Sequence, residues 1–195
     1  VLSTEQAENA SIIAGFNTGS GASVEDANLF NYGLGVAPRA QVGASKIFRC
    51  DGSFGLSSTL AALQASAYAK GARIANHSWG AATAGAYVAD SQTMDSLVRD
   101  AQPGGGTPGN QELVEVVSAG NSGSGANTIA SLATAKNVIA VGASEGVRPD
   151  GTTDGCGVGN TGSDDAHDMI GFSSRGPTDD LRTKPDIVAP GTKIT

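Results

Sequence analysis

The chain has 195 residues, of which 39% are hydrophobic, 16% are charged and 28 are glycine, and its formal net charge is −7. No apolar stretch approaches the ~18 residues of a membrane span, and no run of lysine or arginine offers the phosphate contacts on which nucleic-acid binding depends. Integral membrane proteins and nucleic-acid-binding proteins are therefore excluded, and the length suits one domain with a sizeable core.

Short apolar strands alternate with helices along the chain. Apolar spacing, glycine stops and turn residues predict a short helix that Gly15 ends, a strand at 41–48, a helix from an N-cap at Ser57 to Gly71, a strand at 72–79, a helix at 88–101, and strands at 113–119, 137–143 and 185–189. This alternation predicts an α/β domain with a mostly parallel sheet and right-handed crossovers.

One predicted strand ends in Val117-Ser118-Ala119-Gly120-Asn121-Ser122-Gly123. A glycine at this point lets the backbone come close to whatever occupies the crevice beyond the strand. The side-chain amide of Asn121 would then lie at the crevice, where a fixed NH2 donor can stabilise a developing oxyanion. The alternative interpretation is a plain strand-to-loop turn that Asn121 holds.

A histidine and a serine are neighbours at the end of another strand, in Asn76-His77-Ser78-Trp79-Gly80. Because neighbouring side chains of a strand point to opposite faces, His77 and Ser78 do not face each other as a catalytic pair. We therefore interpret His77 as a packed or partly exposed side chain. The segments 172–177 and 184–191 are locally typical of turns and a strand.

Five segments together are more specific than any one of them. In chain order they read Ala-Asn-His-Ser-Trp-Gly, Ser-Ala-Gly-Asn-Ser-Gly, Val-Ile-Ala-Val-Gly-Ala, Phe-Ser-Ser-Arg-Gly-Pro and Lys-Pro-Asp-Ile-Val-Ala-Pro-Gly. This order resembles the subtilisin-like serine proteases, the subtilases of peptidase family S8. It is most similar to the large calcium-binding alkaline subtilases, and the resemblance extends from about Ala10 to Thr195.

The resemblance implies a subtilisin-like three-layer α/β fold, with a mostly parallel sheet between helices. It implies that residues 1–195 are a single partial catalytic domain, truncated at both ends. Subtilases transfer acyl groups with an Asp, a His and a Ser, and an Asn side chain completes the oxyanion hole. By motif position, Asn121 resembles that Asn.

The resemblance also implies a cleft in which an extended peptide pairs its backbone with the enzyme. Ser78, Trp79 and Gly80 resemble one wall of this cleft, and Gly52, Ser53 and Phe54 resemble the opposite edge. Ala119 and Gly120, with Ala130 to Ala133 opposite, would line the primary specificity pocket.

The catalytic triad of the family has no match among these residues. The family's Gly-Thr-Ser-Met-Ala segment is not in the sequence, and the two histidine positions of its His-Gly-Thr-His-Val-Ala segment fall on Glu5 and Glu8. His167 lies beside Asp164, Asp165 and Asp168 in a polar loop, which favours a solvated side chain. A serine without a base is a poor nucleophile, so we expect no peptide hydrolysis from these residues alone.

Two functions are consistent with a cleft that lacks matches to the triad motifs. The first is the core of a secreted serine endopeptidase, a hydrolase whose triad lies in other segments. The alternative is a non-catalytic pseudoprotease or peptide-binding module that keeps the cleft. A Gly-Thr-Ser-Met-Ala segment downstream in the parent reading frame would favour the first. A nucleotide-binding domain is not supported, because no phosphate-binding glycine motif follows a strand.

The chemistry needs no cofactor, but Ca²⁺ is possible as a structural ion. The loop with Glu25, Asp26 and Asn28 is one candidate, and Asp150, Asp154, Asp164, Asp165 and Asp168 form another; the alternative for both is a solvated acidic loop. Cys50 and Cys156 lie beyond strands that are several places apart in the family's sheet, so we expect no disulfide between them.

The resemblance implies an extracellular location, although the sequence has no signal peptide. The expected partner is a peptide or protein substrate. In subtilases the strand that bears the catalytic Asp lies between those like 41–48 and 72–78, and this sequence lacks it. We therefore expect parent segments or a second copy of the chain to complete the sheet.

Overall fold

The computed structural model describes residues 12–17, 19–21, 24–25, 29, 31–55, 58–147 and 162–192. These residues form two compact units that divide between Ser58 and Thr59. No helix in these ranges is long and apolar enough to cross a membrane. The features expected at Glu5, Glu8, Ser57 and Cys156 lie outside the described residues.

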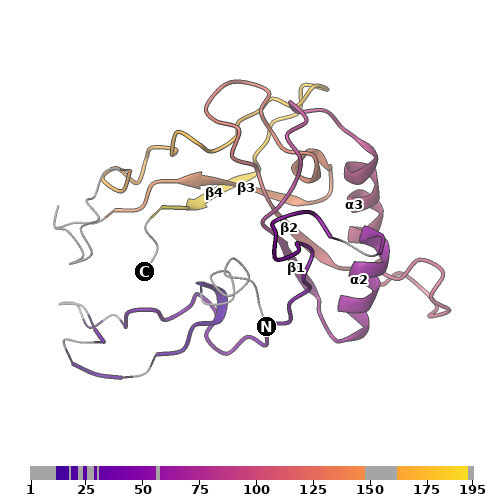
Figure 1. Cartoon of the computed structure of the whole chain (residues 1–195), viewed down its shortest axis with the longest axis horizontal. Helices are drawn as coiled ribbons and strands as arrows, with labels where there is room; N and C mark the ends of the chain where they lie inside the picture. The colour runs from indigo at the N-terminus through magenta and orange to yellow at the C-terminus, as the bar shows by residue number, and fades with distance from the viewer. Residues whose placement is uncertain are drawn as a thin grey trace. The chain divides into compact units, whose positions relative to one another are not determined.

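The second unit carries a parallel sheet, as the alternating pattern predicts. Its strands are β1 (Ile74–His77), β2 (Val114–Ser118), β3 (Ile139–Ser144) and β4 (Ile187–Pro190). They pair in the order β1-β2-β3-β4, with every pair parallel (Figure 1). Since all four strands run in the same direction, their carboxyl ends lie at one edge of the sheet.

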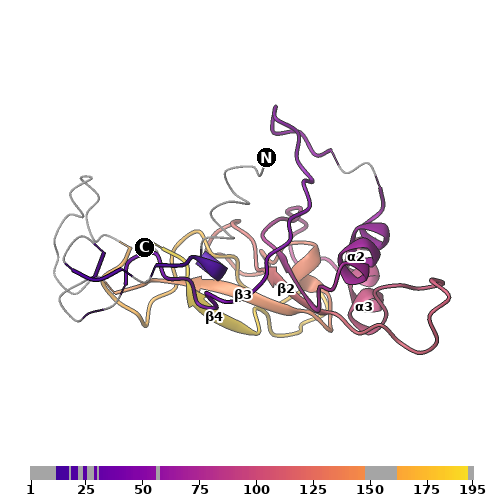
Figure 2. The ribbon, with the colours of Figure 1, turned by 90° about the horizontal axis from the view of Figure 1, so that it is seen from below.

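Two helices and one 3₁₀ turn cover one face of this sheet. They are α2 (Leu60–Ala69), α3 (Ala89–Arg99) and η1 (Leu132–Thr134). Figure 2 shows α2 and α3 side by side, as they are in Figure 1. Met94 and Leu97 of α3 are buried with Val117 and Ala140 of the strands, which confirms the expected apolar face of this helix. Burial of these side chains is the main source of the unit's stability.

The start of α2 differs from the prediction. The N-cap is Thr59, whose Oγ1 accepts a hydrogen bond from the Ala62 N–H at 3.2 Å, so the N-cap expected at Ser57 is wrong. Both residue types cap helices well, and the Thr59 hydroxyl is the one that meets an orphan N–H of the first turn. The helix ends as expected, since Gly71 has φ of +99° directly after the C-cap Lys70.

The other face of the sheet is apolar and open within the second unit. Ile74, Ile139 and Ile187 point to this face and are exposed by 68%, 38% and 54%. The register places Ile74 beside Val114, which is also exposed. The unit therefore covers one face of its sheet with its own helices, and the expected second helical layer stays a prediction.

An ion pair directly before β4 gives the Lys-Pro-Asp segment a structural role. The ammonium of Lys184 is buried, 2.6 Å from Asp186 Oδ2, and it donates to the Val138 carbonyl. The same carboxylate oxygen accepts the Ala140 N–H at 2.7 Å. These contacts fasten β4 to β3, so this part of the motif has a structural role.

The first unit is mostly loop. Residues 12–14 are helical and Gly15 follows them, as expected. Its segment 41–47 is not a strand, so that prediction is wrong, and Phe48 forms only an isolated antiparallel bridge with Phe54. A strand needs a partner for its backbone groups. In this unit the Gly55 N–H donates to the Ile47 carbonyl at 2.8 Å beside the Phe48–Phe54 bridge, which makes a short turn and not an extended ladder, and Gly43 weakens the strand tendency of the segment further.

Candidate active site

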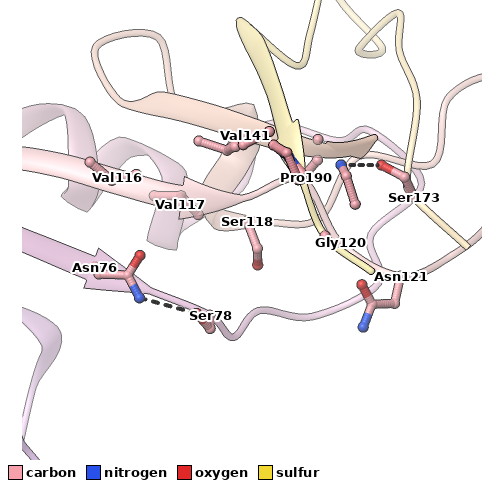
Figure 3. Close-up of a pocket in the computed structure, with 15 residues that line it drawn as sticks. Asn76, Ser78, Val116, Val117, Ser118, Gly120, Asn121, Val141, Ser173 and Pro190 are labelled. Carbon is pink, nitrogen blue, oxygen red and sulfur yellow. Dashed lines mark hydrogen bonds between the residues drawn. The ribbon is translucent and has the colours of Figure 1, made fainter. Parts of the chain in front are cut away.

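Two cavities lie toward the carboxyl ends of the strands, within the second unit, and the first extends over strand residues such as Val116 and Val141. Their volumes are about 250 Å³ and about 300 Å³. They share four lining residues, Ser78, Ser118, Gly120 and Asn121. Figure 3 shows the first cavity, with β2 and β1 ending toward Asn121 and Ser78. This is the place where ligands bind in open α/β sheets.

The chain needs glycine at position 120. Gly120 has φ of +110°, which L side chains rarely adopt, and a Cβ there would lie 2.9 Å from both Ala130 Cβ and Ser174 Oγ. The close neighbours are thus groups of the protein itself, and the predicted close approach of a crevice ligand to this backbone stays a prediction. The consequence of these close neighbours is that the next residue, Asn121, leaves the sheet at a fixed point.

Asn121 lines both cavities and is exposed. In Figure 3 its amide points away from the strands, into the open space. Within the described part of the chain, its side chain makes no hydrogen bond, so it does not hold a turn in the way that the plain-turn interpretation requires. An unengaged NH2 donor at a cavity rim can bind a developing negative charge.

The segment Phe172–Pro177 braces this site, a role that the sequence interpretation missed. Ser174 donates its backbone N–H to the Gly120 carbonyl at 2.9 Å, and its buried hydroxyl accepts the Ser122 N–H at 3.0 Å. Ser173 Oγ accepts the Ala143 N–H at 3.0 Å (Figure 3). The residues on both sides of Asn121 are thus fixed, and two adjacent serines before an arginine are the signal in the sequence.

The end of β1 forms another wall. Ser78, Trp79 and Gly80 line the second cavity with Ala130, and their role as a wall of a substrate cleft stays a prediction. Ser131 ties this wall down, since its N–H donates to the Ala81 carbonyl at 2.9 Å and its hydroxyl accepts the Ala81 N–H at 3.1 Å. Ala119 lines the first cavity, whereas Leu132 and Ala133 are fully buried behind the wall.

His77 and Ser78 point apart, as predicted. His77 is buried at 4% exposure, while Ser78 is exposed and accepts a hydrogen bond from Asn76 Nδ2 at 3.1 Å. His167 is exposed by 97% and contacts Asp165, so it is the solvated side chain that we expected. Neither described histidine is placed beside a serine hydroxyl as a general base.

Gly52, Ser53 and Phe54 lie in the first unit, in a turn that Asp51 shapes. The Asp51 carboxylate accepts the hydroxyl and the backbone N–H of Ser53 at 2.6 and 2.9 Å, and the hydroxyl is the main reason that the Asp51 pKa is lowered. The turn is ordered within its own unit. Its expected role as the opposite edge of the cleft stays a prediction.

The acidic loops do not form a metal site among the described residues, where no three metal-ligating side chains cluster. Glu25 instead accepts the Gly21 N–H at 2.8 Å, and Asp165 is engaged by His167. Asp26, Asn28, Asp150 and Asp154 lie outside the described residues, so calcium binding stays a prediction. Cys50 is a free, exposed cysteine, and the absence of a bond to Cys156 likewise stays untested.

Comparison with known proteins places this geometry in a family. A sequence profile of the subtilase family matches residues 7–195. Serine protease AprX of Bacillus subtilis (strain 168) is 43% identical over 82 residues, which are 42% of this chain and 16% of AprX.

Two solved structures share the fold. Sphericase is 29% identical with a TM-score of 0.53, and the match covers 83% of this chain and 46% of sphericase. The S41 psychrophilic protease is 25% identical with a TM-score of 0.52, and the match covers 81% and 46%. The chain thus spans less than half the length of these relatives. Its profile match covers nearly all of its residues, and the chain belongs to the subtilase family.

Proposed function

We propose that this chain is part of the catalytic domain of a secreted serine endopeptidase, which hydrolyses peptide bonds by acyl transfer. The observation that carries the proposal is the unengaged Asn121 amide at the rim of both cavities, directly after the strained Gly120. Membership of a family of serine proteases supports the reaction class. The proposed extracellular location rests on that membership, because members of this family are commonly secreted.

In the proposed reaction Asn121 acts on the carbonyl oxygen. When a nucleophile attacks the carbonyl carbon of the scissile bond, an electron pair moves onto the oxygen, and the Asn121 Nδ2–H donates to that oxyanion. The donor is exposed before substrate binds and its backbone is already fixed by Ser174, so little reorganisation is needed. The nucleophile, base and orienting acid would come from Ser, His and Asp in family segments that these 195 residues do not contain.

The proposed substrate is an extended peptide. Ser78, Trp79 and Gly80 follow β1, and their backbone groups would pair with the peptide as an added strand. Ala130 and Gly120 at the second cavity are small, which leaves room for a substrate side chain. Backbone pairing gives affinity in such a cleft, and the cavity selects the side chain.

The test uses the full protein that contains this chain, with a fluorogenic peptide as substrate. We expect hydrolysis and labelling by a fluorophosphonate probe in the wild type. Asn121→Ala should lower kcat by ~10²–10³, the usual cost of one oxyanion donor. Asn110→Ala is the matched control, because Asn110 is an exposed asparagine that lines neither cavity.

Two results would contradict the proposal. An unchanged kcat in Asn121→Ala would remove Asn121 from the reaction. A wild-type protein that binds peptides without hydrolysis or probe labelling would instead be a peptide-binding module.

A further inference from the structure

A buried chain of polar side chains leads from the core to the cleft wall. His77 of β1, Glu115 of β2 and Gln64 of α2 are 4%, 1% and 2% exposed. The imidazole Nε2 lies 2.8 Å from Glu115 Oε2, and the Gln64 amide donates to the same oxygen at 3.0 Å. On the other side of the ring, the Trp79 indole donates to His77 Nδ1 at 3.1 Å. The residues thus form a relay from Glu115 through His77 to Trp79.

The indole fixes where the imidazole proton lies. An indole N–H can only donate, so His77 Nδ1 must be an acceptor and the ring is the neutral tautomer with its proton on Nε2. Nε2–H then donates to the Glu115 carboxylate. The Gln64 amide nitrogen also lies 2.7 Å from Nε2, and in this arrangement both nitrogens donate to the same Glu115 oxygen.

Trp79 connects this relay to the site. It lines the second cavity between Ser78 and Gly80, and its ring meets His77 edge to face with centroids 5.8 Å apart. It also packs against the core cluster of the second unit. The orientation of one side chain is therefore shared by the core and the cavity wall.

We propose that His77 is a positioning residue for the cleft: its Nδ1 holds the Trp79 indole and thereby fixes the wall at Ser78–Gly80. Glu115 selects the tautomer that makes Nδ1 an acceptor, a supporting role that hydrogen-bonded carboxylates play for many functional histidines. This inference rests on the proposed peptide cleft. It explains why a carboxylate and an imidazole are buried beneath the sheet, at positions that apolar side chains could occupy.

Two variants of His77 each remove one of its two hydrogen bonds and keep the other. The amide oxygen of Asn occupies roughly the place of Nδ1, so His77→Asn keeps the acceptor for Trp79 and loses the donor to Glu115. The amide nitrogen of Gln occupies roughly the place of Nε2, so His77→Gln keeps the donor to Glu115 and loses the acceptor for Trp79. Both remove the ring, which makes them matched controls for each other.

The first readout is the indole N–H signal of Trp79 in ¹⁵N-tryptophan-labelled protein, assigned by its loss in Trp79→Phe. We expect a signal shifted downfield in wild type and in His77→Asn, and shifted upfield in His77→Gln. An indole signal that is the same in all three proteins would show that His77 does not hold Trp79.

The second readout compares KM with stability. Loss of the wall contact in His77→Gln should raise KM about 3–10-fold, the scale of one net hydrogen bond, while kcat stays near wild type. His77→Asn should lower the urea midpoint further, because it leaves the buried Glu115 carboxylate without its imidazole partner, and yet have the smaller effect on KM. If KM follows the order of the urea midpoints, His77 is a structural core residue and the proposal is wrong.

The wild-type protein supplies a test that needs no variant to fold. Long-range ¹H–¹⁵N spectra of the His77 ring distinguish an unprotonated Nδ1 from an unprotonated Nε2, and we expect the former. The opposite tautomer would overturn the relay. The tautomer and indole signals do not depend on turnover, so they can fail or succeed independently of the proposed peptidase activity.

Discussion

The two walls of the candidate cleft share one kind of contact, a serine brace on the backbone, and differ in a second kind. After β2, the residues around Asn121 are fixed by backbone groups and by the hydroxyl of Ser174. After β1, Ser131 braces Ala81 in the same way, but Trp79 is in addition linked through its indole to a buried side-chain relay. A backbone brace fixes one geometry, whereas a side-chain relay can be changed by one proton or one substitution. The oxyanion side is therefore expected to be the rigid half of the site and the Trp79 side the adjustable half.

The most damaging change on the rigid side is Gly120→Ala. The new Cβ would meet Ala130 and Ser174 at 2.9 Å while the residue keeps φ of +110°. Backbone strain and overpacking each cost about 1–3 kcal/mol, so we expect the free energy of unfolding to fall by about 3 kcal/mol in urea titrations. Gly123→Ala is the control with strain alone, because its nearest atom would lie 3.8 Å away. Equal midpoints for the two variants would contradict the close approach at Gly120.

A smaller change asks whether the brace serves the site or only the fold. Ser173 and Ser174 are both buried, and each hydroxyl accepts one backbone N–H at 3.0 Å. Replacing either with alanine should cost about 1 kcal/mol. Only Ser174 holds the residue after Asn121, so Ser174→Ala should lower kcat more than Ser173→Ala at equal stability. Equal losses of kcat in the two variants would show that Ser174 affects catalysis only by stabilising the fold.

The smallest effect concerns the outer support of the cavity wall. Arg182 donates to the Thr134 carbonyl of η1 at 2.7 Å and to the exposed Asp180 carboxylate. The Arg182 hydrogen bond, followed by that of Thr178, lowers the pKa of Asp180 to about 2. Because the folded pKa lies below the ordinary value, the stabilisation by Asp180 is present above about pH 4 and is lost as the pH falls toward 2.

Unfolding titrations in low salt at several pH values between 4 and 2 would measure the contribution of Asp180 to the free energy of unfolding. We expect Asp180→Asn to flatten the decline of stability in that range, by a small amount because exposed ion pairs are weak. A decline as steep as in the wild type would show that Asp180 titrates equally in the folded and unfolded chain.

The sequence predicted those helices and strands whose formation depends on the local pattern of apolar residues. The strands after 72 and the helix at 88–101 appear near their expected bounds, since short apolar runs and spacing at Met94 and Leu97 are local signals. The strand at 41–48 failed for the opposite reason. Its apolar residues suit a strand, but strand formation depends on a partner that local pattern does not reveal.

The sequence marks the candidate site where a motif ends a strand, and it does not reveal the residues that long-range contacts bring to the site. Gly120 and Asn121 follow from a strand end with a glycine. Glu115 and Gln64 were not singled out, although each is a polar residue within an otherwise apolar pattern. Their meaning depends on the register that places Glu115 beside Ala75 and on the packing of α2 over the sheet, and neither can be read from one sequence.

The most direct test of the central claim compares two ligands that differ at one group. A peptide aldehyde forms a tetrahedral adduct whose oxygen occupies the oxyanion site, and the matching peptide alcohol binds the cleft without that adduct. In the full protein, Asn121→Ala should weaken aldehyde inhibition by ~10²–10³ and leave inhibition by the alcohol unchanged. Equal inhibition of wild type and Asn121→Ala by the aldehyde would show that Asn121 does not stabilise the oxyanion.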